Sequence, residues 1–244
     1  MRLLLVGYGA MNKRVAKLAE DNGHTIVAAV SPNDEGDCPF PLFESISSKL
    51  PSADCLIDFS HPTLTKDVLS SDLNIPMVIA TTGEKDTLVE LMNKKAEHAP
   101  VFFSANMSYG VHIVTQLLET IAPLMGDYDI EMIEKHHNQK IDAPSGTLIK
   151  LLDAITEKAR PEANEVYDRS QVTKKREKED IGISTIRGGT IVGEHEVLFA
   201  GHDEVISIKH SAQSKDIFAR GALKVAEKLV KKENGFYTYN NLGV

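Results

Sequence analysis

The N-terminal segment constrains the fold more strongly than any other part of this sequence. An apolar run of strand length, Leu3 to Val6, leads directly into the turn Gly7-Tyr8-Gly9, and apolar residues with the spacing of one helix face follow. A strand, a glycine turn and a helix in this order form a dinucleotide-binding fingerprint, in which the backbone approaches a pyrophosphate at the helix N-terminus. A simple tight turn between a strand and a helix is the alternative interpretation.

The fingerprint is incomplete, because its third glycine is missing and Asn12 or Lys13 stands near that position. The glycines that permit the tight turn and the close approach of the backbone are both present. We therefore predict cofactor contacts along this stretch, at Gly7, Tyr8, Gly9, Ala10, Met11 and Asn12.

The end of the second predicted strand bears on which cofactor binds. That strand, Thr25 to Val30, is followed by Ser31, whereas an NAD-selective site usually carries an acid there for the ribose hydroxyls. Because no acid at this point repels a 2′-phosphate, we expect NADPH or NADH to bind, with Ser31 beside the ribose. Asp34 and Glu35 come later and fit a solvated loop better.

Strands and helices continue to alternate through the first part of the chain. Further strands are predicted at 53–59, 75–80 and 101–104, helices at 64–69 and 84–95, and a loop with a short helix at 32–52. This alternation predicts a Rossmann-type, doubly wound parallel sheet, whose ligands lie beyond the carboxyl ends of its strands. The residues at the last two ends that we expect to hold the cofactor are Ala80, Thr81, Thr82, Ser104, Ala105, Asn106 and Met107. Ordinary turn chemistry explains Thr81 and Thr82 equally well.

After Asn106 the rhythm of the sequence changes. A long helix is predicted at 111–121, and polar and apolar residues alternate at 181–187, 195–200 and 205–210. These three segments are separated by glycines and predict an open, mainly antiparallel sheet in an α+β domain. The charged stretch 159–180 reads as a solvated surface loop. A hinge near 106–110 would separate the two parts.

The densest cluster of chemically active residues lies between a predicted strand, Asp129 to Ile133, and the start of a helix. His136, His137 and Lys140 can all carry positive charge, and either histidine can transfer a proton near neutral pH. The start of the helix follows with three suitable residues, a proline for the first turn, a serine as the cap and a glycine that leaves the backbone open, at Pro144, Ser145 and Gly146. The segment therefore predicts a site for a small polyanion, most simply a dicarboxylate.

Two other interpretations of this cluster compete with the anion site. Adjacent histidines and a lysine after a strand also fit a solvated turn. A metal site is less favoured, because adjacent strand residues point to opposite faces and no Cys-x-x-Cys or His-Glu-x-x-His pattern is present. We therefore predict no metal.

Composition excludes several classes of function. The formal net charge is −8, and without a long basic run the chain does not resemble a nucleic-acid binder. No apolar stretch is long enough to span a membrane, and the run after Arg2 is too short for a signal peptide. Cys38 and Cys55 are the only cysteines, so we expect no disulfide framework and a cytoplasmic location.

The segment Glu134-Lys-His-His-Asn-Gln-Lys-Ile-Asp-Ala-Pro-Ser-Gly-Thr147 closely resembles the 4-hydroxy-tetrahydrodipicolinate reductase (dihydrodipicolinate reductase) family. It matches every fixed position of the family pattern E-x-H-H-x-x-K-x-D-A-P-S-G-T. Supporting matches extend over nearly the whole chain, at Gly7-Tyr-Gly-Ala-Met, Ile57-Asp-Phe-Ser60, Ala80-Thr-Thr-Gly83, Ser104-Ala-Asn-Met-Ser-Tyr-Gly110, Arg187-Gly-Gly-Thr-Ile-Val-Gly-Glu-His195 and Phe218-Ala-Arg-Gly221.

The resemblance implies an NAD(P)H-dependent oxidoreductase. Its implied reaction is the reduction of 4-hydroxy-tetrahydrodipicolinate to tetrahydrodipicolinate in the diaminopimelate route to lysine. It also implies a dinucleotide-binding domain made of residues 1–106 and 216–244, and a substrate-binding domain, 107–215, that builds a homotetramer. Family members usually carry an acid where Ser31 stands, which leaves the choice between NADH and NADPH open.

Carried over by position, the resemblance also implies roles for single residues. His136 is the proton donor and acceptor at the reacting ring, and Lys140 is a second proton donor. His137 binds the substrate, while the backbone of Gly146 and Thr147 holds a carboxylate. Two other hypotheses compete with this one. A nucleotide sensor would not need the proton donors, and a different dehydrogenase would act on another amino-acid precursor.

Overall fold

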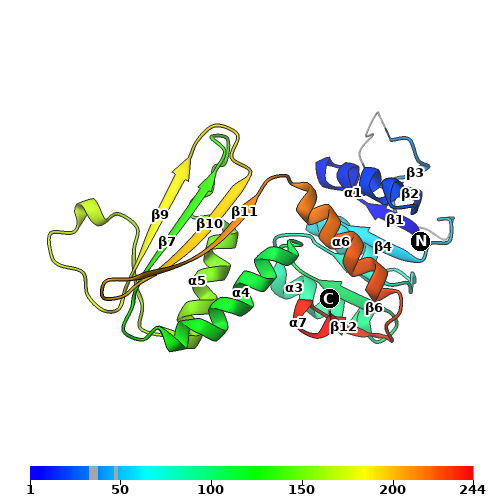
Figure 1. Ribbon diagram of the computed structural model, residues 1–244. Helices are drawn as coiled ribbons and strands as arrows, with labels where there is room; N and C mark the ends of the chain where they lie inside the picture. Colours follow the sequence, from blue (N-terminus) through cyan, green and yellow to red (C-terminus); the bar gives the residue numbers. More distant parts are fainter. Residues whose placement is uncertain (33–37, 47–48, 244) are drawn as a thin grey trace. The chain divides into compact units, whose positions relative to one another are not determined.

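The computed structural model describes residues 1–32, 38–46 and 49–243, which form two compact units (Figure 1). The first unit consists of Met1–Ser108 and Asp216–Val244, and the second is Tyr109–Lys215. The chain passes from the first unit to the second after Ser108, two residues later than the predicted boundary after residue 106. Met107 stays with the first unit because its carbonyl oxygen accepts a hydrogen bond from Tyr239 Oη, at 2.8 Å. Asp34 and Glu35 lie outside the described residues.

The first unit contains a seven-stranded sheet in which every pairing is parallel, in the order β12-β6-β5-β4-β1-β2-β3. Its strands are β1 (Arg2–Val6), β2 (Thr25–Val30), β3 (Leu42–Phe43), β4 (Cys55–Asp58), β5 (Met77–Ile79), β6 (Pro100–Phe103) and β12 (Gly235–Tyr237). The central strands are apolar throughout because helices cover both faces of the sheet. This is the Rossmann-type arrangement that the alternating sequence pattern predicts.

The helices of the first unit divide between the two faces of the sheet. They are α1 (Ala10–Asp21), α2 (Pro62–Ser70), α3 (Lys85–Ala96), α6 (Asp216–Leu229) and the short α7 (Tyr239–Leu242). Leu4 and Val6 belong to a buried cluster together with Leu64 of α2 and Leu88 of α3. On the other face α6 packs beside α1, so the C-terminal segment completes the layer that the N-terminal segment begins (Figure 1).

One detail of the first unit differs from the sequence-based expectation. In place of a short helix, the described part of 32–52 contains the two-residue strand β3, which pairs with the end of β2. The residues after the last long helix form the edge strand β12, which pairs with β6, and then α7. Both edge strands are short, which limits the exposed hydrogen-bonding edge of the sheet.

The second unit is a five-stranded sheet, in the order β11-β10-β7-β9-β8, with two helices packed on one face. Its elements are α4 (Tyr109–Ile121), β7 (Asp129–His136), α5 (Gly146–Ala159), β8 (Asn164–Val166), β9 (Asp180–Arg187), β10 (Gly193–Ala200), β11 (Val205–Ala212) and the 3₁₀ turns η1 (Ala122–Leu124) and η2 (Arg169–Gln171). Met132 of β7, Phe199 of β10 and Leu152 of α5 meet in a buried core. This core fixes β7 and the start of α5 relative to each other.

The second sheet is mixed, not mainly antiparallel. β10 pairs antiparallel with β7 and β11, but β9 pairs parallel with β7 and β8. The parallel pairs arise because the chain returns across the sheet twice, through α5 between β7 and β8 and through residues 167–179 between β8 and β9. The alternating pattern of the single strands does not reveal this direction.

The charged stretch 159–180 is more ordered than a solvated loop. It contains β8 and η2, and Arg176 has ion pairs with Asp129 and Glu131 on β7. The Arg176 guanidinium also donates to the carbonyl oxygen of Ile130, at 2.9 Å. The stretch is therefore attached to the sheet both through the strand β8 and through Arg176. Within the described residues, no helix combines the length and apolarity needed to cross a membrane.

Candidate active site

The turn between β1 and α1 has the geometry that its glycines predict. Gly7 has φ +73°, and a Cβ at this position would lie 2.9 Å from Ser60 Cβ. Gly9 is the N-cap of α1 and gives the helix no side-chain cap, and no atom lies within 4 Å of the position of its missing Cβ. The helix N-terminus therefore presents backbone N–H groups to open space, which suits a phosphate group.

Asn12 explains how the turn works without its third glycine. Its side chain is buried, and Nδ2 donates to the carbonyl oxygens of Val6 at 2.8 Å and Gly7 at 2.6 Å. These bonds hold the start of α1 against the end of β1. The side chain of Asn12 is thus committed to the turn, and only its backbone is available to a cofactor.

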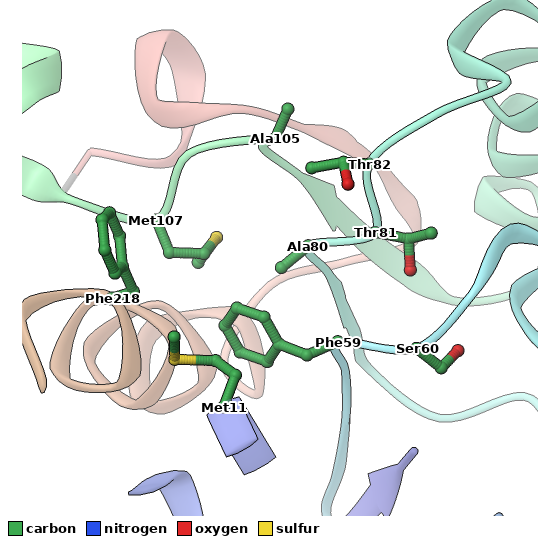
Figure 2. Close-up of a pocket in the computed structure, with 9 residues that line it drawn as sticks. All are labelled: Met11, Phe59, Ser60, Ala80, Thr81, Thr82, Ala105, Met107 and Phe218. Carbon is green, nitrogen blue, oxygen red and sulfur yellow. The ribbon is translucent and has the colours of Figure 1, made fainter. Parts of the chain in front are cut away.

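A pocket of about 270 Å³ opens at the carboxyl ends of the parallel strands (Figure 2). Met107 Sδ and the ring of Phe59 point into it, and Thr82 stands on its rim. Its lining includes six of the predicted cofactor residues, together with two residues that follow β4 and one on α6; in full, Met11, Phe59, Ser60, Ala80, Thr81, Thr82, Ala105, Met107 and Phe218. Phe59 and Ser60 directly follow the carboxyl end of β4, the edge at which a parallel sheet predicts ligands, although they had not been assigned a contact. Phe218 lies in a segment for which the sequence offered only the resemblance.

Behind this pocket lies a polar layer that faces the protein interior. The hydroxyl group of Thr81 is buried and lies 2.7 Å from that of Thr65. Asp58 is fully buried beside them and accepts from the backbone N–H of Ser60, at 2.7 Å. Burial raises the pKa of Asp58, although hydrogen bonds from Ser60, Thr65 and Thr81 oppose the shift. Thr81 therefore shapes the pocket wall from behind.

The other predicted cofactor residues occupy two loops of the first unit. Ser104 Oγ donates to the carbonyl oxygen of Asn106 at 2.7 Å and so closes the turn after β6. Tyr8 and Ser31 are both largely buried. A dinucleotide fits the open space at Gly9, the uncapped start of α1 and the apolar pocket at the strand ends. At the end of β2 the residue is Ser31 and not an acid, so the choice between NADH and NADPH stays open.

The second group of candidate residues lies at one end of the mixed sheet. β7 continues to His136, three residues beyond the predicted strand end, so Glu134 and His136 point to the same face. On β10, His195 lies directly opposite Glu134. A Cβ on Gly193 would lie 3.1 Å from His136 Nε2, so this glycine makes room for the imidazole ring.

Glu134 is the centre of a buried hydrogen-bond network. Its carboxylate has no exposed side-chain area, and Oε2 contacts His136 Nδ1 in a short hydrogen bond. The other oxygen, Oε1, accepts from Arg187 Nη2 at 2.7 Å and from the backbone N–H of Ser145 at 3.3 Å. Burial alone raises the pKa of Glu134, but the hydrogen bonds from Arg187 and His136 outweigh it and hold the pKa below its ordinary value.

His136 presents its second nitrogen away from Glu134. Within the described residues, Nε2 has no protein hydrogen-bond partner, whereas Nδ1 is held by the carboxylate. Burial lowers the pKa of His136 below its ordinary value, and Glu134 acts in the opposite direction. A histidine with one nitrogen fixed and the other open can exchange a proton with a bound molecule.

The start of α5 closes the site from the helix side. Ser145 is the N-cap, as predicted, and its Oγ accepts from the backbone N–H of Leu148 at 3.2 Å. The same hydroxyl lies 3.0 Å from His195 Nε2. Pro144 does not occupy the first helical turn; it precedes the cap, because the helix begins at Gly146.

The remaining predicted residues surround this end of the sheet. Lys140 Nζ forms an ion pair with the Asp142 carboxylate, with distances of 2.7 and 2.9 Å to its two oxygens. His137 is half-buried at the end of β7, and Gly146 is exposed at the helix start. The residues brought together are therefore His136, Lys140 and the α5 N-terminus, with Arg187 near Asp142.

Glu134, His136 and His195 form the one group within the described residues whose ligand atoms, all within 4.8 Å of one another, could hold a metal ion. A cationic guanidinium already lies 2.7 Å from one oxygen of Glu134, and His136 Nδ1 contacts the other. These contacts favour a proton between the two side chains rather than a metal ion.

Sequence reasoning missed Glu134, Arg187 and His195 as members of the site. A signal for Glu134 was present, since extending the predicted strand to His136 places both residues on one face with Met132. For Arg187 and His195 the sequence contained only the resemblance, because their proximity depends on the pairing of β7 with β9 and β10.

Comparison with known proteins covers the whole chain. Residues 1–107 match the sequence profile described as dihydrodipicolinate reductase, N-terminus, and residues 110–242 match dihydrodipicolinate reductase, C-terminus. The chain is 56% identical over 242 residues to the 4-hydroxy-tetrahydrodipicolinate reductase of Staphylococcus carnosus, covering 99% of both proteins. It is 57% identical to the protein of that name from Staphylococcus saprophyticus, covering 99% of this chain and 100% of the relative.

Solved structures share the fold at lower sequence identity. A dipicolinate-bound dihydrodipicolinate reductase from Paenisporosarcina sp. TG-14 superposes with a TM-score of 0.77 at 20% identity, covering 98% of this chain and 97% of that one. The DAP dehydrogenase of Corynebacterium glutamicum, in complex with DAP, has a TM-score of 0.55 at 12% identity, covering 98% and 92%. At these identities the likeness concerns the fold alone.

Proposed function

The chain belongs to the dihydrodipicolinate reductase family, and from this premise we propose how its residues carry out the reaction. It reduces 4-hydroxy-tetrahydrodipicolinate to tetrahydrodipicolinate with NADH or NADPH, a step of lysine biosynthesis. The bound dinucleotide supplies the hydride. Because the product lacks the 4-hydroxyl group, the balance also requires one proton and releases one water molecule. The hypotheses of a sensor and of a different dehydrogenase are thereby set aside.

We propose that the first unit, 1–108 with 216–244, is the dinucleotide-binding domain. The backbone of Gly9, Ala10 and Met11 at the uncapped start of α1 would hold the pyrophosphate. The pocket at the strand ends, with Ala80, Thr82 and Ala105 on its wall, would hold the nicotinamide end. We propose that the other predicted cofactor residues of this unit bind the dinucleotide through backbone atoms. The side chains of Asn12 and Thr81 are already hydrogen-bonded within the protein.

We propose that the second unit binds the substrate dicarboxylate at the N-terminus of α5. The backbone amides of Gly146 and Thr147 belong to the first turn, where N–H groups and the helix dipole favour an anion. His137 and Lys140 add hydrogen bonds or charge from the preceding loop. Each charge-assisted hydrogen bond to a carboxylate contributes roughly 1.5–3 kcal/mol.

The proton is assigned to His136. The single observation that supports this most strongly is the pairing of Nδ1 with buried Glu134, which leaves Nε2 open beside Gly193. An imidazolium in this position donates from Nε2 to the ring as the hydride is added, and the neutral imidazole then recovers a proton from solvent. Lys140 is the second donor. A positioned acid of this type contributes roughly 10²- to 10⁴-fold to the rate.

We propose a homotetramer in the cytoplasm as the working form. The exposed apolar side chains on the second sheet support association through this unit, at Ile186, Val205 and Ile206, which are 44%, 62% and 37% exposed. Two cysteines without a disulfide, Cys38 and Cys55, fit a reducing compartment. Sedimentation analysis of the purified protein tests the assembly, and a monomer at micromolar concentration would contradict it.

The test of the proposed function follows oxidation of NADPH or NADH with freshly prepared substrate. We expect turnover by the wild type, and a fall in kcat of roughly 10²- to 10⁴-fold for His136→Gln. Cofactor dissociation constants should stay unchanged, because the substitution lies in the other unit. An unchanged kcat would remove His136 from the mechanism. Comparing kcat/KM for the two cofactors also settles the preference left open by Ser31.

A further inference from the structure

We propose that Glu134 is the positioning residue for His136: it holds the imidazole with Nδ1–H toward its Oε2 and Nε2 toward the substrate, while Arg187 keeps it ionised. This inference rests on the proposed role of His136. It adds a function for a carboxylate that would touch neither substrate nor cofactor.

The two oxygens of Glu134 have separate partners. Oε1 accepts from Arg187 Nη2 at 2.7 Å and from the Ser145 backbone N–H at 3.3 Å, and these contacts tie β9 and the start of α5 to β7. Oε2 contacts His136 Nδ1. A carboxylate that served only to join the three elements would need Oε1 alone. The engagement of Oε2 is the part that acts on the imidazole.

The burial of Glu134 determines which nitrogen of His136 carries the proton. A carboxylate with no exposed side-chain area remains ionised only when charged or hydrogen-bonding partners compensate for the loss of water. Arg187 supplies a charge, and Ser145 supplies a backbone donor. Since an ionised carboxylate only accepts hydrogen bonds, His136 Nδ1 must carry the proton. Nε2 is then the nitrogen that gains or loses a proton during turnover.

Other charged groups around His136 do not replace this contact. The titratable groups that act on it or lie beside it are Glu134 on β7, Arg187 on β9, His195 on β10 and Lys140 in the loop before α5. Arg187 and Lys140 are cationic and disfavour the imidazolium. Burial leaves His195 with a pKa of about 4, so it is neutral at pH 7. Glu134 is thus the one anion in this set.

The substitution Glu134→Gln separates the joining of β7, β9 and α5 from the orientation of the His136 imidazole. The amide oxygen must face the donors of Arg187 and Ser145, so the amide NH₂ faces His136 Nδ1. A donor now meets a donor when His136 is protonated, which disfavours the imidazolium. The pKa of His136 should therefore fall, whereas the joining of the three elements is largely kept.

The experiment compares the pH profiles of kcat for wild type and Glu134→Gln. We expect the decline of kcat with rising pH to move about one to three pH units lower in the variant, with unchanged cofactor binding. Asp180→Asn is the matched control, since Asp180 is 2% exposed and paired with Arg169 at 2.9 Å at the far end of β9. This control should lose stability without moving the profile. Superimposable profiles for Glu134→Gln and wild type would overturn the proposal.

A measurement on the wild type keeps the proposal testable should Glu134→Gln fail to fold. Nitrogen NMR of histidine-labelled enzyme, with the His136 signal assigned from His136→Gln, reports which ring nitrogen carries the proton. We expect a protonated Nδ1 at a pH where the ring is neutral; an unprotonated Nδ1 would refute the proposal. A full-rate His136→Gln enzyme would instead contradict the proposed function, so the two failures are distinguishable.

Discussion

Gly193 on β10 faces His136 on β7, and a Cβ added to this glycine would lie 3.1 Å from His136 Nε2 and 3.4 Å from Cδ2. Gly193→Ala should therefore push the ring by a few tenths of an ångström. Because a misplacement of about 1 Å can reduce a rate about 10²-fold, we expect kcat to fall roughly 3- to 30-fold. Steady-state kinetics with both substrates measures this.

The control for this prediction is Gly188→Ala. Gly188 lies between β9 and β10, has no atom within 4 Å of the position of its missing Cβ and has no positive φ. Its substitution should leave kcat within about twofold of wild type. Equal losses in both variants would show that the effect comes from the backbone, not from contact with His136.

Lys140 should contribute to substrate binding and to proton delivery. Its ammonium group pairs with Asp142, 20% of its side chain remains exposed, and it lies in the loop that leads to the α5 N-terminus. We expect Lys140→Ala to lower kcat/KM for the substrate by about 10- to 100-fold, the equivalent of one charge-assisted hydrogen bond, with unchanged cofactor binding.

Lys135→Ala provides the comparison for Lys140. Lys135 is adjacent to His136 but points to the opposite face of β7, where it pairs with Glu194 at 3.4 Å. Its loss should leave kcat/KM nearly unchanged, because a partly exposed ion pair contributes little. Wild-type kinetics in Lys140→Ala, measured beside this control, would contradict the assigned role.

His195 should make the protein less stable in acid. Burial lowers the pKa of His195 from 6.5 to about 4, so the unfolded chain takes up a proton at this residue before the folded chain does. This contribution of His195 to the free energy of unfolding is fully present above about pH 6.5 and is lost as the pH falls toward 4. The complete loss amounts to roughly 3 kcal/mol. Urea unfolding of wild type and His195→Gln across this range should show their difference in unfolding free energy shrinking in acid.

His202→Gln tests whether this trend belongs to the buried position. The side chain of His202 is 98% exposed, so its removal should leave the pH dependence of unfolding as in the wild type. A difference between His195→Gln and wild type that stayed constant from pH 7 to about 4 would refute the assignment to His195.

Among the described glycines of the first unit, Gly221 on α6 should be the least replaceable. A Cβ there would lie 1.8 Å from the carbonyl oxygen of Met107, a backbone atom that cannot move without the pocket loop. We expect Gly221→Ala to lower the free energy of unfolding by about 3 kcal/mol or more and to weaken NADPH binding. Gly126→Ala, which meets no atom within 4 Å, should do neither, and similar denaturation midpoints for both would exclude the clash.

The local pattern of the chain predicted most of the first unit. Apolar runs such as Leu3 to Val6, each followed by helical spacing, required a parallel sheet covered on both faces, and the structure has one. The same logic predicted the Ser145 cap. It failed where pairing partners decide the outcome, as in the direction of β9 beside β7, which made the second sheet mixed.

The sequence by itself determined which residues have chemistry to offer, because His136, Lys140 and the start of α5 lie within one short segment. Only the tertiary structure decided what surrounds them. Arg187 is distant from Glu134 along the chain, and it reaches the carboxylate through the pairing of β7 with β9. The physical reason is that a buried charge depends on partners that the fold brings together, and no local pattern of residues records them.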